Sequence, residues 1–313
     1  MKIGFVDLDT SHPRRYLPIL RRMGHDVAGV FDAGDVHPEG YAQEFAREHE
    51  IASVFESLEE MAGRVDAAFV MGCDWDHHAE RSRPFVERGK AIFLDKPIAG
   101  NARDLATFQQ WADSGARLTG GSALRYVEET QEFLAMNPEE RGELHTLFCG
   151  CAVDDFNYGI HAFAHTLGYL TSPISKVRFL GQGGQKLAEI ACENECRALI
   201  SFGQQTASLP FHASLVTDRK VFHTIVDNAR IYESALAAVM PYLSGAIEEP
   251  PIPFSQLIEA EKCALLTLAS EEADGVWKRM DRDLGASPSF DGRQFCESYR
   301  ISRYPASREL QAR

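Results

Sequence analysis

Long apolar runs and an excess of positive charge are both missing from this sequence. No stretch approaches the roughly 18 consecutive apolar residues of a membrane-spanning helix. The opening residues lead directly into a strand, so we expect no leader, no membrane span and a cytoplasmic protein. Lys and Arg total 32 against 46 Asp and Glu, a formal net charge of -14 without a basic patch. Nucleic acid and anionic membranes are therefore not expected partners.

The cysteines lack the pattern of a disulfide framework or of a zinc knuckle. There are seven of them, an odd number, and they are scattered along the chain. The pairs Cys149 with Cys151 and Cys192 with Cys196 do not have the usual C-x2-C spacing of zinc ligands. We expect free, buried thiols and no bound metal.

Length and composition favour two domains, because 313 residues with 44% hydrophobic content exceed the usual size of one. In residues 1–120, short apolar strands alternate with helices, which predicts a Rossmann-type α/β domain with a parallel sheet and ligands at its carboxyl edge. The strands are expected at Lys2–Val6, Asp26–Phe31, 53–55, Ala67–Met71, Ala91–Leu94 and Arg117–Gly120, and the helices at Tyr16–Met23, Tyr41–His49, Leu58–Ala62, His78–Arg88 and Ala102–Ala112.

Residues 121–305 have a different pattern, since most of their apolar segments follow one another as strands without helices between them. This predicts an α+β domain with a mostly antiparallel sheet. One helix is expected to begin near Asn157, and another covers Phe254–Lys278 after a Pro-rich stretch. Residues 306–313 are expected to form a tail.

The first strand-to-helix turn lacks all three glycines of the dinucleotide fingerprint. Its six positions are Asp7-Leu8-Asp9-Thr10-Ser11-His12. Inward carboxylates would repel a diphosphate, whereas Thr10 and Ser11 are good helix caps whose hydroxyls can donate to phosphate oxygens. The next residues, Arg14 and Arg15, are either substitutes for the glycine-loop contacts or solvated side chains.

Asp32 stands at the end of the second predicted strand. An acidic residue there accepts hydrogen bonds from the adenosine ribose and repels a 2′-phosphate, which favours NAD over NADP. The alternative is a turn residue before Ala33 and Gly34.

Three ordered motifs resemble the Gfo/Idh/MocA family of two-domain oxidoreductases. Asp95-Lys96-Pro97 leaves a buried strand, as the family's Glu-Lys-Pro does, and is followed by a helix and a Gly-rich strand that ends at Arg125-Tyr126. The segment 73–78 stands where the family has Thr-Pro-Asn-x-x-His, with only His78 matching. Finally, the segment from Asn157 to His161 is similar to Asp-x-Gly-x-His. The resemblance spans residues 1–280.

The resemblance implies roles for individual residues. Lys96 would orient the substrate hydroxyl, and His161 would be the general acid or base. Asn157 replaces an acidic residue, a function that Asp154 or Asp155 could supply. The implied cofactor contacts are Asp9, Thr10, Ser11, His12, Asp32, Cys73, His78, Asp95 and Lys96. The implied substrate contacts are Lys96, Arg125, Asp154, Asp155, Asn157, His161 and His165.

Asn157, His161 and His165 are spaced four apart, so on one helix they would share a face. Two histidines at this spacing are also a metal-ligand pattern, with Asp154 or Asp155 as a third ligand. The alternative, a His165 that packs the helix, needs no metal.

The leading hypothesis is an NAD-dependent oxidoreductase that transfers hydride to or from a secondary alcohol or ketone of a sugar, cyclitol or sugar derivative. The expected partners are this polyhydroxylated small molecule and further copies of the chain in a homo-oligomer. Two alternatives stay open: a non-oxidative lyase, epimerase or hydrolase on the same scaffold, and a catalytically silent ligand-binding protein.

Overall fold

The structure, a computed structural model, describes residues 1–151, 154–203 and 209–304. Its N-terminal part is a six-stranded parallel sheet in the order β3-β2-β1-β4-β5-β6. The strands are β1 (Lys2–Val6), β2 (Asp26–Phe31), β3 (Ser53–Val54), β4 (Ala67–Val70), β5 (Ala91–Leu94) and β6 (Leu118–Gly120). The helices between them are α1 (His12–Arg22), α2 (Tyr41–Glu48), α3 (Leu58–Ala62), α4 (His78–Glu87) and α5 (Ala102–Asp113), with the 3-10 turn η1 (Trp75–His77). The predicted Rossmann fold is confirmed.

The second part is a seven-stranded sheet in the order β12-β11-β7-β10-β9-β8-β13. Its strands are β7 (Leu144–Gly150), β8 (Ile174–Gln182), β9 (Lys186–Cys192), β10 (Arg197–Phe202), β11 (His212–Thr217), β12 (Val221–Ile225) and β13 (Lys278–Arg279). Every pairing is antiparallel except that of β7 with β10, which is parallel. The expected mostly antiparallel sheet is therefore confirmed.

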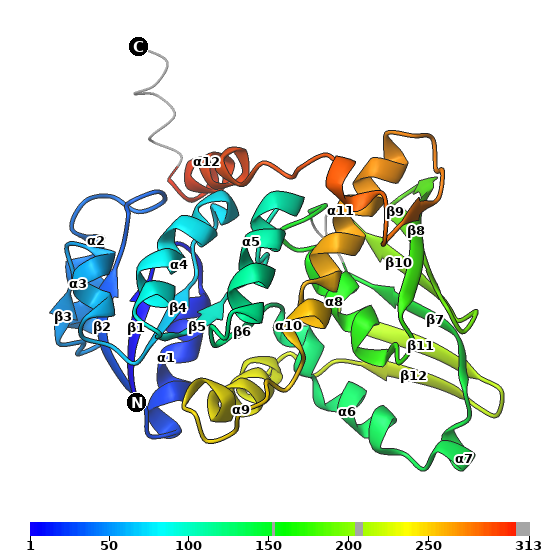
Figure 1. Ribbon diagram of the computed structural model, residues 1–313, viewed down its shortest axis with the longest axis horizontal. Helices are drawn as coiled ribbons and strands as arrows, with labels where there is room; N and C mark the ends of the chain where they lie inside the picture. Colours follow the sequence, from blue (N-terminus) through cyan, green and yellow to red (C-terminus); the bar gives the residue numbers. More distant parts are fainter. Residues whose placement is uncertain (152–153, 204–208, 305–313) are drawn as a thin grey trace.

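Helices and 3-10 turns flank this sheet and join it to the Rossmann part (Figure 1). They are η2 (Ala123–Tyr126), α6 (Glu128–Ala135), α7 (Pro138–Arg141), α8 (Ile160–Tyr169), α9 (Ile231–Leu243), α10 (Phe254–Leu257), α11 (Glu259–Glu271), η3 (Leu284–Ala286) and α12 (Gly292–Arg303). None of the described helices has the length and apolar content needed to cross a membrane.

Several predicted boundaries were wrong. The single helix expected over Phe254–Lys278 is divided at Ile258 into α10 and α11, and Lys278 begins a strand. Positive φ angles at Asp274 and Gly275 end the helical path before that strand. The first helix begins at His12 rather than at Tyr16, with Pro13 in its first turn, where a missing N–H costs nothing. Helices α6, α7, α9 and α12 were not predicted.

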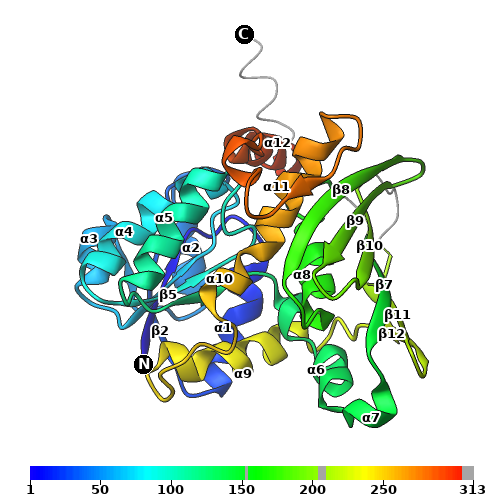
Figure 2. The same cartoon turned by 45° about the vertical axis from the view of Figure 1, so that its right-hand side comes forward.

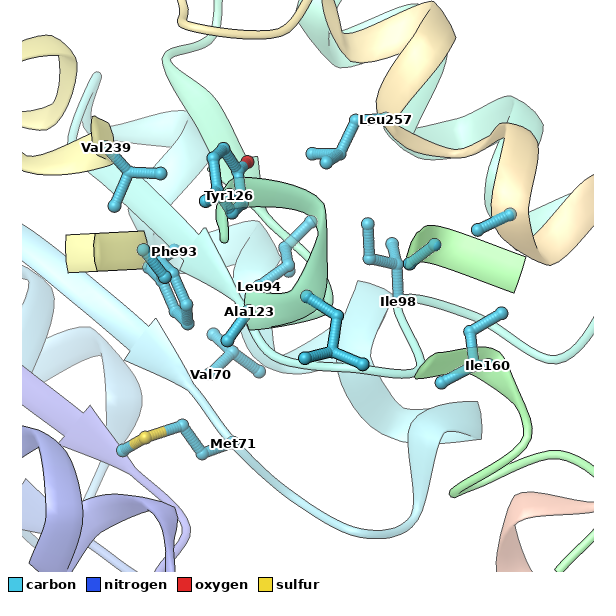
Figure 3. Close-up of a cluster of buried hydrophobic side chains, with 14 of the residues drawn as sticks. Val70, Met71, Phe93, Leu94, Ile98, Ala123, Tyr126, Ile160, Val239 and Leu257 are labelled. Carbon is cyan, nitrogen blue, oxygen red and sulfur yellow. The ribbon is translucent and has the colours of Figure 1, made fainter. Parts of the chain in front are cut away.

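One hydrophobic core crosses from the Rossmann part into the second part. Figure 3 shows Val70 and Leu94 of the parallel sheet close to Ile98 and Ala123, with Ile160 of α8 and Leu257 of α10 on the other side. These side chains are buried, so separating the two parts would expose a large apolar area. The continuous core therefore fixes the start of α8 relative to the carboxyl end of β5.

Helix α12 returns from the second part to cover the Rossmann part. Figures 1 and 2 show this red helix beside α4 and α5, away from the antiparallel sheet. Trp75 of η1 donates from Nε1 to the carbonyl of Phe290 at 2.9 Å, and Gly292 N donates to Asp76 at 2.9 Å. These contacts attach α12 to the loop after β4. The predicted tail, 306–313, lies outside the described residues.

Candidate active site

A cavity of about 630 Å³ lies where the carboxyl edge of the parallel sheet meets α8 and α9. Its walls come from both parts of the chain and combine basic, aromatic and amide side chains. The main ones are Thr10, Ser11, His12, Arg15, Lys96, Asn157, Tyr158, His161, Phe211, Tyr232 and Tyr299. The three residues expected to be catalytic, Lys96, Asn157 and His161, therefore face one space.

Lys96 follows β5 and holds the two parts of the chain together at this cavity. Its Nζ donates to the carbonyl oxygen of Asn157 at 3.0 Å and to the Oδ1 of the same residue at 3.1 Å. Burial lowers the pKa of Lys96, while Asp95 and Asp154 act in the opposite direction. A buried lysine with two neutral acceptors is poised to donate a hydrogen bond to a substrate oxygen.

His161 lies in the first turn of α8, edge-on to the rings of Tyr158 and Phe211, which stack on each other. Its Nδ1 is 2.6 Å from Ser122 Oγ, which also accepts from Leu124 N. Its Nε2 has no hydrogen-bond partner among the described residues. Burial lowers the pKa of His161 well below its usual value, and Lys96 and His12 add to this effect. The imidazole is therefore neutral at pH 7 and able to exchange a proton through Nε2.

His12 and Asp95 form a pair that the sequence did not suggest. The Nδ1 of His12, at the start of α1, is hydrogen-bonded to Oδ2 of Asp95, which follows β5. Burial raises the pKa of Asp95, but His12 and Lys96 outweigh it and hold this pKa below its usual value. Both residues were predicted as cofactor contacts. A carboxylate that binds one imidazole nitrogen and leaves the other toward a cavity is instead typical of a proton-transfer pair.

The expectation that Asn157 shares a helix face with His161 and His165 was wrong, because α8 begins at Ile160 and Asn157 precedes it in a turn. Asp154 closes this turn by accepting from Tyr158 N at 2.6 Å. The turn presents the Asn157 carbonyl and amide oxygens to Lys96, so Asn157 reaches the cavity without belonging to the helix.

Four predicted substrate contacts do not line the cavity: Asp154, which closes the turn before α8, and Asp155, Arg125 and His165. Asp155 pairs with Lys186 at 2.8 Å. Arg125 is interior, with Glu259 as its strongest opposing charge. His165 is buried beside Tyr169, with both ring nitrogens unpartnered, and burial lowers its pKa to about 4. His165 therefore packs the helix. Of the two interpretations given for it, metal ligand and packing residue, the structure agrees with the second.

The predicted cofactor contacts do not share one groove. Thr10, Ser11 and His12 line the cavity of Lys96, whereas Asp32 lines a separate cavity of about 750 Å³ beside α2. Asp32 Oδ1 accepts from Gly34 N at 3.1 Å, which is the turn contact considered as its alternative role. Burial raises the pKa of Asp32 to about 6.

The remaining predicted cofactor contacts are enclosed. Both ring nitrogens of His78 are hydrogen-bonded to backbone carbonyl oxygens, Nδ1 to that of Ile98 at 3.0 Å and Nε2 to that of Gly72 at 2.8 Å. Asp9 is fully buried, and its Oδ2 accepts from Cys73 N at 2.8 Å. Burial raises the pKa of Asp9 to about 8, and Asp7 adds to the shift. These side chains stabilise the loops at the sheet edge and do not face either cavity.

Asp7, which starts the glycine-free turn, also points inward. It forms an ion pair with Arg81 of α4 at 2.6 Å and accepts from Ala33 N at 3.3 Å. Its own backbone has a φ of +65°. Arg14, considered as a phosphate contact, lines the cavity of Lys96 and also pairs with Glu48 of α2 at 2.8 Å.

Side chains of α12 fill the space between the two cavities. Cys296 packs with Val36 and Cys73 in a small buried cluster, which Phe295, Tyr299 and Tyr304 enlarge. His37 links this cluster to the turn after β1. Its Nδ1 is hydrogen-bonded to Tyr304 Oη at 2.8 Å, and its Nε2 is hydrogen-bonded to the carbonyl oxygen of Leu8 at 3.1 Å. The sheet edge between Asp32 and Lys96 is thus covered by the chain itself.

A sequence model of the family described as "Oxidoreductase family, NAD-binding Rossmann fold", the Gfo/Idh/MocA family, matches residues 8–119. The Rossmann domain belongs to the Gfo/Idh/MocA family. The resemblance stated from the motifs of the sequence is confirmed, and with it the expectation of an oxidoreductase family whose dinucleotide is NAD. No curated protein matches the chain by sequence.

Solved structures of Gfo/Idh/MocA-type dehydrogenases have the same two-part fold. A scyllo-inositol dehydrogenase from Lactobacillus casei with bound NAD(H) and scyllo-inositol has a TM-score of 0.74 at 13% identity, covering 90% of this chain and 99% of that one. A myo-inositol dehydrogenase from the same organism, with NAD(H) and myo-inositol, has 0.74 at 12%, covering 89% and 96%. A UDP-N-acetylglucosamine 3-dehydrogenase from Acidithiobacillus ferrooxidans has 0.73 at 13%, covering 87% and 98%.

The residues of this Rossmann domain do not fit NAD along the usual path of a Rossmann dinucleotide. That path runs across the strand switch point between β1 and β4, from the acidic residue after β2 to the catalytic end. Here the positions after β1 and β4 carry the buried Asp9 and Cys73, and Cys296 of α12 packs against Cys73. The buried Asp9 carboxyl also lies where backbone amides should approach a diphosphate.

Proposed function

We propose that this chain is an enzyme that acts on a CH–OH or C=O carbon of a polyhydroxylated small molecule bound in the cavity of Lys96. The observation that carries the proposal is that Lys96, His161 and the His12 of the His12–Asp95 pair line one cavity. A silent binding protein would not need three proton-transfer groups around one ligand, two of them held by buried partners. Polar and aromatic walls together suit a sugar or cyclitol ring.

The residues divide the proton transfers among them. Lys96, held by the two oxygens of Asn157, donates to the substrate oxygen and stabilises negative charge that develops there. His161 exchanges a proton with a hydroxyl through Nε2, while Ser122 fixes its ring. His12, oriented by Asp95, provides a second acid or base on the side of α1.

The site favours a redox-neutral reaction, such as the epimerisation or elimination left open from the sequence. In such a reaction a C–H proton next to a carbonyl is removed, and then either the proton returns or a β-hydroxyl leaves as water. The substrate has no net oxidation or reduction, so no electron acceptor is required. The covered sheet edge between Asp32 and Lys96 supports this class.

A dehydrogenase is the second candidate, favoured by the family match and by the NAD(H)-bound inositol dehydrogenases. In that class NAD supplies the hydride acceptor. Net formation of NADH from a CH–OH substrate distinguishes it from the redox-neutral class.

The test is a panel of inositols, aldoses, ketoses and their oxidised derivatives in deuterated buffer, followed by proton NMR and by absorbance of NADH. We expect wild-type protein to exchange or rearrange one substrate without NADH, and Lys96→Met to lose the activity by about 100-fold or more. Lys220→Met, an exposed lysine in the β11–β12 turn, is the matched control. Activity that survives in both Lys96→Met and His161→Gln would contradict the assignment of this cavity.

A further inference from the structure

Among the described residues, one group of three possible metal ligands brings its ligand atoms together. Asp9 follows β1, Cys73 follows β4 and Cys296 lies in α12, and their carboxylate and sulfur atoms are all within 4.8 Å of one another. The three residues are at most 4% exposed. They are far apart in sequence, so the fold alone creates this arrangement.

The carboxylate in this group is incompletely satisfied. Asp9 Oδ2 accepts from Cys73 N, but Asp9 Oδ1 is buried and has no hydrogen-bond partner. An unpartnered carboxylate oxygen in the interior is costly, because it has lost water and gained nothing in return. This oxygen lies within reach of two thiols, which are weak hydrogen-bond donors but strong metal ligands as thiolates.

The donor set selects the metal. Two sulfurs and one carboxylate oxygen suit zinc, which binds sulfur at about 2.3 Å and oxygen at roughly 2.0–2.2 Å in a tetrahedron. Tetrahedral ligands at those lengths lie roughly 3.3–3.8 Å apart, within the 4.8 Å that the three atoms span. Magnesium and calcium take oxygen ligands, so neither fits a site with two thiols.

We propose that the chain binds one Zn²⁺ between Asp9, Cys73 and Cys296, with water as the fourth ligand. On binding, each cysteine loses its S–H proton and Asp9 its carboxyl proton to solvent, two sulfur–zinc bonds and one oxygen–zinc bond form, and zinc stays divalent. The ion joins α12 to the carboxyl ends of β1 and β4. It occupies the place where a Rossmann protein receives its dinucleotide, and it gives the buried Asp9 the partner that it lacks.

The role is structural, because the three ligands are not among the residues that line the cavity of Lys96. Tyr299 lies three residues after Cys296 on α12 and does line that cavity. Zinc therefore fixes the wall to which Tyr299 belongs, and its removal is expected to loosen α12 while the two sheets persist.

The experiment measures metal directly on the full-length protein. Elemental analysis after purification in zinc-supplemented medium is expected to give one zinc per chain. Chelator-treated protein titrated with Co²⁺ is expected to develop thiolate-to-cobalt charge-transfer absorption and the ligand-field bands of a tetrahedral site. The melting temperature is expected to rise when Zn²⁺ is returned.

Variants identify the ligands. Cys296→Ser and Cys73→Ser are each expected to weaken the charge-transfer absorption, and Asp9→Asn to lower Co²⁺ affinity at least tenfold while both thiolates remain. Cys263→Ala is the matched control, since Cys263 is equally buried but lies in α11. Helix α12 is at the periphery, so Cys296→Ser is not expected to prevent folding.

Three outcomes would overturn the proposal. The first is wild-type protein that neither retains zinc nor binds Co²⁺ after reduction. The second is a Cys296→Ser spectrum equal to that of wild type. The third is a Cys73–Cys296 disulfide in freshly purified protein, detected as a mass lower by two hydrogens, since this bond would use both sulfurs. None of these readouts depends on turnover, so they leave the proposed function to its own test.

Discussion

The imidazole of His12 and the carboxylate of Asp95 are hydrogen-bonded to each other where the first helix and the fifth strand meet the cavity. They are 83 residues apart in sequence. Lys96, the next residue after Asp95, faces the same cavity, so one short segment both orients an imidazole and presents an ammonium group. This relationship places two of the proposed proton-transfer groups on the Rossmann side of the cavity, with His161 opposite.

Asp95→Asn is expected to lower turnover by about 100-fold or more, because the amide cannot stabilise a protonated His12. It is also expected to change the pH dependence of stability. The folded pKa of Asp95 lies below its ordinary value of 3.8. Its stabilising contribution is therefore present above pH 3.8 and is lost as the pH falls through the lower, folded-state pKa.

Urea unfolding at neutral and acidic pH measures this contribution. The loss of unfolding free energy in Asp95→Asn should be largest near neutral pH and should shrink below about pH 4. Asp26→Asn, at the exposed start of β2, is the control and should leave stability nearly unchanged. A difference that grows on acidification would contradict the assigned direction of the pKa shift.

His165→Leu is expected to stabilise the protein in mild acid and to leave the cavity intact. Burial lowers the pKa of His165 from 6.5 to about 4. Below pH 6.5 the unfolded chain therefore binds a proton that the folded chain excludes, and wild-type stability falls until the pH reaches the folded pKa. At pH 5 the penalty is about 2 kcal/mol, by the relation of roughly 1.4 kcal/mol per unit.

Thermal or urea unfolding of His165→Leu and wild type at pH 7.5 and pH 5 tests this. The stability advantage of the variant should be larger at pH 5, and its turnover at pH 7.5 should match that of wild type. His223→Leu, at an exposed histidine of β12, serves as the comparison. Loss of turnover in His165→Leu would assign this histidine to the site after all.

Full-length protein is expected not to take up NAD with the affinity of a dehydrogenase. The path between Asp32 and Lys96 is closed by Val36, Cys73 and Cys296, so binding would have to separate α12 from the sheet edge. Isothermal calorimetry with NAD and NADH should show no saturable heat up to millimolar concentration. The scyllo-inositol dehydrogenase that holds NAD(H) is a positive control. Saturation at micromolar NAD would restore the dehydrogenase as the first candidate.

Gly120→Ala is expected to destabilise the fold by about 3 kcal/mol or more. Gly120 has a φ of +133°, and a Cβ there would be 2.1 Å from the carbonyl oxygen of Leu94 on the neighbouring strand. The strain would fall beside the segment that carries Lys96. Gly285→Ala has open space and an ordinary φ, so it should change the unfolding free energy by less than about 1 kcal/mol. Equal effects at the two glycines would refute this explanation.

The sequence predicted elements wherever a local pattern determines the structure. Alternation of apolar strands with amphipathic helices was sufficient for the Rossmann sheet, and β1, β2, α3 and β5 were predicted to the residue. The motifs around Lys96 and His161 placed these two side chains correctly at one cavity, because residues after parallel strands share one sheet edge. The absence of glycine from the turn after β1 also follows from the sequence alone.

Only the tertiary structure decided what the glycine-free turn does. Asp9 contacts the backbone of Cys73, His12 pairs with Asp95, and α12 closes over the edge from a distant part of the chain. Periodicity and spacing report on neighbours along a helix or strand, whereas these contacts depend on which loops the sheet order brings together. The sequence determined the fold and the meeting of Lys96 and His161 at one cavity, whereas long-range packing decided that α12 covers the usual dinucleotide path.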